Sequence, residues 1–442
     1  MNPRRSMATI CAALLGVSSA WGGAPSSLAG LARTVMGAGQ GVYVEAADGA
    51  VLVSQAADVA VHPASVSKIP TTLALLRKFG GEHRFVTVFA SDGRVREDGT
   101  LDGDLIVEAG GDPYFVDENA LLVAERLQQL GVRRVAGQLL VRGAFTFDWN
   151  RDDEGVHLRQ VLSGRAPAAA WAAVHALDAP GPEGAEIELA GLPPMPALQF
   201  AAAAGPLLAG SVIAAAAGQR SAESLVSESR PVGVGREQTL VVHRSQPLLS
   251  LVKSLNDYSN NIFTPLAEAA GGASEVEALA RSAVAPAMRV EITLGDGAGM
   301  DPSNRMSPRA VVALLRVLER ELAASGHTLT DILPVAGIDE GTLHLRLNAA
   351  DEAGRVVGKT GTFGDYGASA LVGAFVTRDR GEVYFALLNH GVPVPLARHR
   401  QDRFVAALLA RLHARRWDYQ RDAHPAVALA SAQIVAPSGA AH

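Results

Sequence analysis

The sequence predicts a mixed α/β (α+β) fold in which an antiparallel sheet is flanked by helices and carries an inserted smaller domain. Residues 41–55 alternate between apolar and polar side chains around Asp48-Gly49, a pattern typical of a β-hairpin. A second hairpin pattern occupies residues 368–391, where two apolar runs meet at the charged turn 378–381. Because a hairpin lies near each end of the chain with helical patterns between, we expect the two ends to share one sheet. The middle of the chain would then form the inserted domain.

A helix is predicted soon after the first hairpin. Apolar residues recur there at helical spacing, and the pattern ends at Gly80-Gly81. Pro70 has no backbone N–H and therefore belongs in the first turn, which places the start of the regular helix near Ser67. We expect residues 65–68 to form a tight turn at this helix start, in which side chains three residues apart nearly eclipse.

The remaining elements alternate between strands and helices. Strand-like runs cover residues 84–90, 103–111, 134–145 and 238–245, and helices are expected near residues 118–130, 247–270 and 398–416. The Ala- and Pro-rich end of the chain predicts disorder. The predicted domains are a main domain of residues 25–85 and 237–418, an inserted domain of residues 86–236, and a disordered tail of residues 419–442.

Residues 1–24 are typical of a cleaved signal peptide. Two arginines in "MNPRR" precede the apolar stretch "MATICAALLGVSSAW", which is too short to span a bilayer comfortably. Small residues at 18–20 or 22–24 supply cleavage sites, although an uncleaved anchor would show the same charge pattern. Cys11, the only cysteine, lies in this segment, so the mature chain would hold no thiolate nucleophile or thiolate metal site. We expect an exported, periplasmic or otherwise extracytoplasmic protein with no stable membrane span after cleavage.

The charge balance argues against a nucleic-acid partner. The chain has 39 Lys+Arg against 45 Asp+Glu, a net charge of −6, and no basic block interleaved with aromatic residues. It has neither a His-Glu-x-x-His zinc motif nor a Gly-x-Ser-x-Gly elbow, and we expect no metal and no cofactor. Residues 189–219 carry no charge, but they are mostly Ala, Gly and Pro. That composition favours an Ala-rich part of a folded domain or a surface segment over a membrane span.

Three short motifs follow one another along the chain. They are Ser65-x-x-Lys68, Ser259-x-Asn261 and Lys359-Thr360-Gly361. Each alone has an ordinary explanation, since the first is compatible with a plain helix start and the second with an exposed polar helix face. Residues 354–360 also resemble a phosphate-binding loop, but the required glycine is missing and a strand follows where that loop needs a helix. The ordered set of three, on fitting secondary structure, indicates a serine enzyme.

The residue types in these motifs suit nucleophilic catalysis by Ser65. A serine hydroxyl needs a base within hydrogen-bond reach, and Lys68 can be that base if burial and a neighbouring cation such as Lys359 lower its pKa. Ser259 offers a hydroxyl that can relay a proton to a leaving amine. Asn261 offers both a donor and an acceptor to a peptide-like substrate.

The last motif and its neighbour offer groups for the rest of the substrate. Lys359, Thr360 and Thr362 can hold a terminal carboxylate. The backbone N–H groups of Ser65 and Thr362 form a natural pair for an oxyanion hole.

In these motifs the chain resembles the class C low-molecular-mass penicillin-binding proteins, D-alanyl-D-alanine carboxypeptidases and endopeptidases that trim peptidoglycan. The resemblance rests on "PASVSKIPTT" (63–72), "GDLIVEAGGDP" (103–113), "YSNN" (258–261), "DGAGMDPSNRMSP" (296–308), "LPVAGIDEGTL" (333–343) and "GKTGT" (358–362). The wide gap between Ser65 and Ser259 is similar to that of this family, which inserts extra domains there, and not to that of β-lactamases. The resemblance implies a penicillin-recognising, serine transpeptidase-like main domain.

The resemblance also implies a role for each motif residue. Ser65 would be the acylated nucleophile, Lys68 the base, Ser259 the proton relay, Asn261 the substrate-amide binder, and Lys359-Thr360-Gly361 the strand edge that receives the carboxylate. Against the family pattern, residues 166–236 are short and Ala-rich, so one inserted domain would be missing or reduced.

The implied function is that of an exported serine DD-peptidase that hydrolyses D-Ala-D-Ala ends of peptidoglycan stem peptides and takes β-lactams as covalent inhibitors. Whether it also cuts cross-links stays open, because both reactions use the same machinery. A serine β-lactamase or esterase of the same fold and a non-catalytic peptidoglycan-binding relative are the alternatives. Asp148, a carboxylate among aromatic residues in "FTFDWN", is expected to bind the free amine of a diamino acid in the stem; a solvated turn aspartate is the other interpretation.

Overall fold

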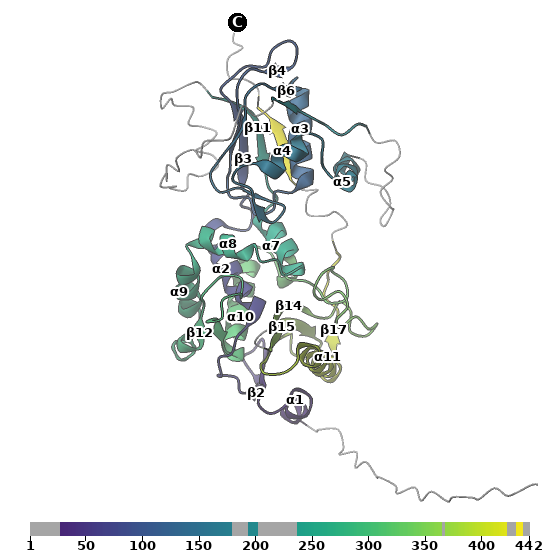
Figure 1. Cartoon of the computed structure of the whole chain (residues 1–442). Coiled ribbons are helices and arrows are strands. Elements are labelled where there is room, and N and C mark those ends of the chain that lie inside the picture. Colours follow the sequence, from purple (N-terminus) through teal and green to yellow (C-terminus); the bar gives the residue numbers. More distant parts are fainter. Residues whose placement is uncertain (1–26, 179–192, 202–236, 365–366, 422–429, 436–442) are drawn as a thin grey trace, which may run out of the picture.

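The computed structural model describes residues 27–178, 193–201, 237–364, 367–421 and 430–435, which form two lobes (Figure 1). We call the lower lobe, the described residues within 27–85 and 246–421, the main lobe, and the upper one, the described residues within 86–245 and 430–435, the inserted lobe. The predicted signal peptide lies outside the described residues, as does most of the uncharged stretch 189–219. Within the described ranges, each helix is too short or too polar to cross a membrane.

One antiparallel sheet forms the centre of the main lobe, in the strand order β14-β15-β16-β1-β2. Its strands are β1 (Gly41–Ala46), β2 (Val51–Gln55), β14 (Val357–Phe363), β15 (Ala368–Thr377) and β16 (Glu382–Asn389), and the short β17 (Ala414–Arg415) pairs with β15. β1 from the N-terminal hairpin lies beside β16 from the C-terminal one, with Gly41 opposite Leu388. The prediction that the two ends of the chain share one sheet is therefore confirmed.

The other elements of the main lobe surround this sheet. They are α1 (Leu28–Met36), η1 (Ala64–Ser67), α2 (Lys68–Phe79), α7 (Leu248–Asp257), α8 (Phe263–Ala270), α9 (Ala273–Ala283), η2 (Pro286–Glu291), β12 (Ile292–Thr293), β13 (Arg305–Met306), α10 (Pro308–Ala324), η3 (Leu329–Asp331) and α11 (Val394–Arg411). The sequence patterns did not predict α1. The last helix begins at Val394, four residues earlier than predicted, because Pro393 and Pro395 are compatible with a first helical turn.

Helices cover both faces of the sheet. Successive residues of a strand point to opposite sides, so neighbouring residues pack on different helices. On one face, Leu371 and Phe385 belong to the same buried cluster as residues of α1 and α11. On the other face, Val372 and Ala386 belong to a cluster with residues of α2 and α10. The central strands β15 and β16 are thus buried on both sides, which explains their nearly continuous apolar sequences.

The turn before α2 has the predicted form. Ala64–Ser67 is a 3₁₀ turn, and α2 follows it directly and ends at Gly80, whose φ is +80°. Pro70 lies in the first turn of α2, as its missing N–H requires. The predicted tight turn at residues 65–68 is therefore confirmed.

The predicted helix 247–270 is wrong in its middle, because the structure has two helices, α7 and α8, separated by residues 258–262. Ser259 has a φ of +57°, its N–H donates to Asn256 O at 3.2 Å, and the N–H of Asn260 donates to Leu255 O at 2.9 Å. These two bonds form a Schellman motif, which ends a helix. Glycine usually takes the left-handed position of this motif, so the serine gave no signal of a break.

The inserted lobe has its own sheet, in the order β18-β11-β3-β5-β7. Its elements are β3 (Val86–Ser91), β4 (Thr100–Leu101), β5 (Leu105–Glu108), α3 (Asp117–Gln129), β6 (Arg134–Val135), β7 (Leu139–Arg142), β8 (Thr146–Phe147), β9 (Asn150–Arg151), α4 (Val156–Leu162), α5 (Ala168–Asp178), β10 (Gln199–Phe200), β11 (Gln238–Arg244) and β18 (Ser431–Ile434). A separate apolar core, with Phe89 and Phe115 fully buried, holds this lobe together. A lobe with its own core therefore lies between Ser65 and Ser259 in the sequence.

Two details of the predicted domain boundaries differ from the structure. β11 pairs with β3, so the chain returns to the main lobe near residue 245 and not at residue 237. The tail is not wholly disordered, because Ser431–Ile434 forms β18, whose Ala432 is buried in the inserted lobe and whose Ile434 lies opposite Val241. Figure 1 shows this yellow strand beside β11. Four residues in an Ala-rich segment are too short a pattern to predict a strand.

Candidate active site

The first two candidate residues lie together at the start of α2. Ser65 is half-buried in the 3₁₀ turn η1, and Lys68 is the first residue of the helix. The Nζ of Lys68 lies 2.8 Å from the Oγ of Ser65. The tight turn brings the two side chains to the same side, as the eclipsed spacing of a 3₁₀ turn requires.

Lys68 is held by two further groups, both of which only accept hydrogen bonds. Its Nζ donates to Ala298 O at 2.7 Å and to Asn261 Oδ1 at 3.2 Å. Burial lowers the pKa of Lys68 to about 7, against a smaller opposing effect of Asp296. A neutral amine has two hydrogens and one lone pair, so with both hydrogens engaged its lone pair faces the hydroxyl of Ser65. This is the arrangement of a general base.

The second hydroxyl of the site is paired with the second lysine. Lys359 on β14 donates from Nζ to Ser259 Oγ at 2.8 Å and to Thr360 O at 3.0 Å. Lys359 is fully buried, and burial, followed by the charge of Lys68, holds its pKa well below the usual value. The left-handed Ser259 at the end of α7 thus points its hydroxyl at a buried amine. A strained serine in such a position is typical of functional sites.

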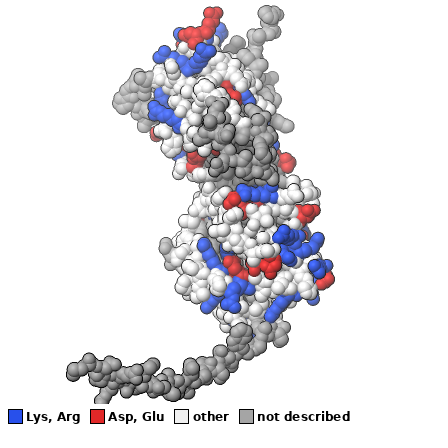
Figure 2. Space-filling model, turned by 90° about the vertical axis from the view of Figure 1, so that its right-hand side faces the viewer, with Lys and Arg blue, Asp and Glu red and all other residues white. Residues whose placement is uncertain are grey.

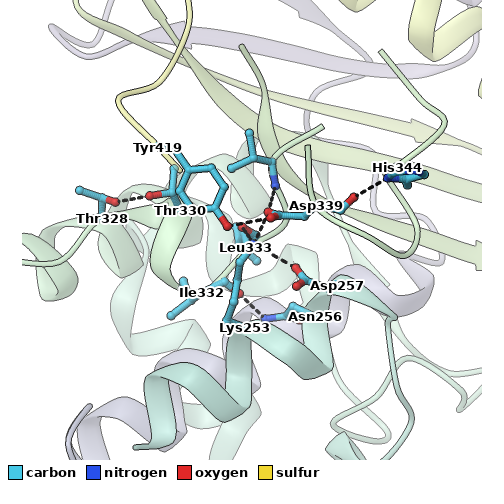
Figure 3. Close-up of polar contacts among 11 residues, drawn as sticks. Lys253, Asn256, Asp257, Thr328, Thr330, Ile332, Leu333, Asp339, His344 and Tyr419 are labelled. Carbon is cyan, nitrogen blue, oxygen red and sulfur yellow. Dashed lines mark hydrogen bonds and ion pairs between the residues drawn. The ribbon is translucent and has the colours of Figure 1, made fainter. Parts of the chain in front are cut away.

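A network of polar contacts holds the end of α7 that carries Ser259 (Figure 3). Lys253 donates to Asp257 Oδ1 at 3.0 Å and to Leu333 O at 2.9 Å, and it also pairs with Asp339. Tyr419 donates to Asp339 Oδ1 at 2.7 Å, so a residue near the C-terminus closes the network. Burial raises the pKa of Asp257 to about 7, while Lys253 opposes that rise.

The same network reaches the strand that carries Lys359. Asn256 Nδ2 donates to Ile332 O at 2.9 Å, which joins α7 to the segment before β14. Two residues further on, Pro334 O accepts the N–H of Gly358 at 3.0 Å. Ser259 and Lys359, which are 100 residues apart in sequence, are therefore placed by one connected set of contacts.

One edge of β14 faces the turn η1, which carries Ser65. The N–H of Gly358 points away from β15 toward Pro334, and backbone groups alternate sides along a strand, so those of Thr360 and Thr362 point outward as well. The N–H of Thr362 is thus directed away from the sheet, as the predicted oxyanion hole requires. We expect this edge to accept an extended peptide, in the manner of strand addition.

Gly361 lets β14 come close to the turn that carries Ser65. A Cβ at this position would lie 2.6 Å from Pro63 O and 3.1 Å from the backbone N of Ser65. The first distance is below any real carbon contact, so only glycine permits the observed approach. The third position of the Lys-Thr-Gly motif must therefore be glycine, because a larger side chain would clash with the turn that carries Ser65.

Arg398 is a residue of this edge that the sequence analysis missed. It lies in the second turn of α11 and donates from Nη2 to Thr362 Oγ1 at 2.9 Å. Burial and then Arg346 lower its pKa from the ordinary value, but a guanidinium stays charged at neutral pH. No local motif could have revealed it, because the pairing joins residues 36 apart in sequence.

Asp148 lies apart from this group, in the inserted lobe. It and Trp149 form the two-residue turn between β8 and β9 with φ of +44° and +65°, positions that non-glycine residues rarely take. Its carboxylate accepts the N–H of Asp117 at the start of α3, and burial raises its pKa. The rings of Trp149 and Tyr114 contact each other edge to face, with their centroids 4.6 Å apart, and Tyr114 packs on the core of the main lobe. Asp148 therefore lies near the junction of the lobes, half-buried in a turn and with its carboxylate bonded at the start of α3.

The arrangement of acidic side chains and the surface charge bear on metal and nucleic-acid binding. Among the described residues, no group of three or more His, Cys, Asp or Glu side chains is arranged to hold a metal ion. On the face drawn in Figure 2, Lys and Arg alternate with Asp and Glu over both lobes and form no continuous basic stripe.

The comparison with protein families gives one match that covers most of the chain. The model of the D-Ala-D-Ala carboxypeptidase 3 (S13) family matches residues 29–159 and 189–412. Carboxypeptidase DacB of Mycolicibacterium smegmatis is 26% identical over 405 residues, which cover 86% of this chain and 82% of the relative.

Solved structures share the fold. The predatory endopeptidase Bd0816 of Bdellovibrio bacteriovorus, in complex with the immunity protein Bd3460, matches with a TM-score of 0.67 at 20% identity, covering 89% of this chain and 99% of that one. Penicillin G-acylated Bd3459 of the same organism gives 0.68 at 18% identity with the same coverage. Penicillin-binding protein 4 of Haemophilus influenzae gives 0.55 at 18% identity, covering 87% and 99%.

Proposed function

Because the chain belongs to the D-Ala-D-Ala carboxypeptidase 3 (S13) family of serine-type carboxypeptidases, we propose that Ser65 is the nucleophile with which it cleaves peptidoglycan stem peptides. The observation that carries the proposal is the pair of hydroxyl–amine contacts, Ser65 with Lys68 and Ser259 with Lys359, each at 2.8 Å. Both amines are buried and have a lowered pKa, and that of Lys68, about 7, lets it take the serine proton near neutral pH.

In the first step, Ser65 Oγ attacks the carbonyl carbon of the penultimate D-Ala. The serine proton passes to the lone pair of Lys68 as the C–O bond forms. The carbonyl oxygen becomes an anion and accepts the N–H groups of Ser65 and Thr362, which the backbone of η1 and the outer edge of β14 supply. Asn261 accepts a hydrogen bond from Lys68 at Oδ1, and its Nδ2, which donates at 3.5 Å to the weak acceptor Met300 Sδ, can turn to the substrate backbone.

In the second step, the C–N bond breaks and the terminal D-Ala leaves as an amine. It needs one proton, which Lys68 returns through the hydroxyl of Ser259, and Lys359 orients that hydroxyl. The remaining ester on Ser65 is hydrolysed by water, which restores the serine and releases the shortened peptide.

The carboxylate of the leaving D-Ala would bind at the outer edge of β14. The hydroxyl of Thr362 accepts a hydrogen bond from Arg398 there, and Arg398 supplies a permanent positive charge; we infer that Thr360, two residues before it on the same strand, adds a second hydroxyl. Buried Lys359, whose pKa is lowered, is a weaker source of charge. The sequence predicts Lys359 as a ligand of the substrate carboxylate. Because Arg398 supplies a charge there, we propose that the main role of Lys359 is to orient the Ser259 hydroxyl.

We further propose that the protein is exported and that it acts on stem peptides and their D-Ala cross-links. The N-terminal charge and hydropathy pattern supports export. Digestion of muropeptides with and without cross-links, followed by separation of the products, tests the substrate. Release of D-Ala alone would restrict the activity to carboxypeptidase, and no product from either set would contradict the proposal.

Penicillin is expected to acylate Ser65 and to stay bound for minutes or longer. A β-lactam carries an amide and a carboxylate placed like those of a D-Ala-D-Ala end, so the same groups should promote its attack. In class A β-lactamases a glutamate in a Glu-x-x-Leu-Asn segment activates the water that removes the acyl group. The segment of this chain whose sequence comes nearest to that pattern begins at Glu291, but Arg309 and Ser307 bind the Glu291 carboxylate, so it is not free to activate water. Mass spectrometry of the intact protein after a short penicillin pulse, with peptide mapping, is the measurement. Rapid multi-turnover hydrolysis of penicillin would instead indicate a β-lactamase.

Asp148→Asn is expected to raise KM about tenfold for stems that carry a free side-chain amine, with kcat nearly unchanged. The change removes a charge-assisted hydrogen bond to the amine, while the amide oxygen can still accept the N–H of Asp117. Steady-state kinetics on otherwise identical stems without the amine provide the control, and there the variant should match the wild type. Equal kinetics on both stems would leave Asp148 with only its helix-capping contact.

A further inference from the structure

The turn that carries Ser65 contains a strained residue. Ala64 has a φ of +48°, and it is fully buried directly before the nucleophile. The left-handed conformation is unfavourable for alanine, because its Cβ crowds the following carbonyl. Such a conformation persists only where its surroundings hold it in place.

His62 is one of the groups that hold Ala64. The imidazole Nδ1 lies 3.1 Å from the backbone N of Ala64, and Nε2 lies 3.0 Å from the carbonyl O of Asp301. An amide N–H only donates and a carbonyl only accepts, so Nδ1 must be the acceptor and Nε2 must carry the hydrogen. These partners together require the neutral imidazole, in one tautomer.

His62 also joins the turn to two other parts of the site. Its ring stacks on Phe363 of β14, with centroids 4.5 Å apart at 26°. Asp301 follows the loop that supplies Ala298 O to Lys68. A Cβ on Gly299 in that loop would lie 2.1 Å from Ala64 O, so the loop backbone packs directly against the backbone of Ala64. The imidazole thus lies where the nucleophile turn, the loop and β14 meet.

Resting on the proposed function, we propose that the neutral imidazole of His62 is the positioning group that holds the left-handed Ala64 and so sets Ser65 against Lys68 and the edge of β14. Protonation of the ring would turn the acceptor Nδ1 into a donor facing the N–H of Ala64. The turn would then lose this bond, and Ser65 would shift from its place beside the lone pair of Lys68.

The surroundings of His62 keep the ring neutral at physiological pH. Burial is the largest effect and lowers the pKa of His62 from 6.5, and Arg305 acts in the same direction. Its bond to Asp301 O and the charges of Asp296 and Asp301 oppose this. Two protonations should therefore stop acylation in acid: that of Lys68, near pH 7, and that of His62, at a lower pH.

The test compares acylation by a fluorescent penicillin in the wild type and three variants between pH 5 and 8. His62→Phe keeps the stacking on Phe363 but has no acceptor, and we expect acylation to slow on the order of 100-fold at pH 7.5. His62→Asn can place its amide oxygen near the Nδ1 position and should keep most of the rate. Adding Ala64→Gly to His62→Phe should restore most of the loss, because glycine adopts positive φ without help.

The pH profile separates positioning from a merely structural role. Below the pKa of His62, the logarithm of the wild-type acylation rate should fall with pH at the slope expected for two protonations, of Lys68 and of His62. In His62→Asn it should fall at the slope of a single protonation, that of Lys68. His83→Asn is the matched control, since His83 also has a pKa lowered by burial but packs against Phe79 at the far end of α2. It should keep the wild-type profile.

The proposal is overturned if His62→Phe acylates like the wild type, if Ala64→Gly does not restore the rate, or if the wild type and His62→Asn share one slope. The ¹⁵N chemical shifts of the His62 ring at pH 7.5 give a readout that does not depend on activity, and a protonated Nδ1 in the neutral ring would also overturn it. If wild-type protein is not acylated at all, the proposed function fails, while the ring nitrogens still test the tautomer.

Discussion

Ser65→Ala abolishes turnover of D-Ala-D-Ala stems and the penicillin adduct, while the protein stays folded. The variant removes the atom that attacks the carbonyl, and loss of one member of a cooperative catalytic unit costs on the order of 10⁶ in rate. The hydroxyl is half-buried in a 3₁₀ turn, and within the described part of the chain its hydrogen bond is to Lys68, so the fold loses little. The measurements are steady-state hydrolysis, intact mass after a penicillin pulse, and thermal unfolding.

Ser67→Ala is the matched control for this variant. Ser67 lies in the same turn and is fully buried, and among the described residues its hydroxyl has no hydrogen-bond partner. The control variant should therefore keep its rate and its adduct. If Ser65→Ala retained more than a few per cent of the wild-type activity, the assignment of the nucleophile would be wrong.

Lys68→Met slows acylation on the order of 10⁴-fold, the upper range for loss of a general base. Methionine fills the space of the buried lysine stem but offers no lone pair to the Ser65 hydroxyl. Lys78→Met, at the other end of α2, is the control, because Lys78 is exposed and its contacts are with Ala269 O and the ring of Phe79, away from Ser65. Stopped-flow acylation by a fluorescent penicillin measures both variants.

The wild-type acylation rate should rise with pH through about 7. Lys68 acts as a base only when it is neutral, and burial lowers its pKa to about 7, so the active form gains population above that pH. An acylation rate that is flat between pH 6 and 8, or a Lys68→Met variant with the wild-type rate, would exclude Lys68 as the base.

Local chemistry made much of the site predictable from sequence. Ser65 and Lys68 share one turn, and their spacing and the position of Pro70 suffice to place them side by side. Lys359 and Thr360 directly precede the hairpin pattern of residues 368–391, and the family resemblance implied that they form a strand edge; in the structure they lie in β14 beside β15. The shared sheet followed from two hairpins at opposite ends of the chain.

Features that depend on distant contacts were not predictable. Ser259 takes a left-handed conformation without glycine, and the contacts of the Lys253–Asp339 network hold that end of α7. Arg398 and His62 belong to no motif, and each acts through a partner far away in sequence or through a backbone atom. Helical periodicity and motif spacing report neither kind of contact.

The strand β18 makes the inserted lobe dependent on the last residues of the chain. Ser431–Ile434 covers β11, pairing along it from Val241 to Arg244. A protein shortened before residue 430 would leave the backbone N–H and C=O groups on that side of β11 without partners. Exposed strands of this kind template pairing with other chains. Proteolytic trimming of the C-terminus would therefore favour self-association through the inserted lobe, while Ser65, Lys68 and Lys359, in the other lobe, stay in place.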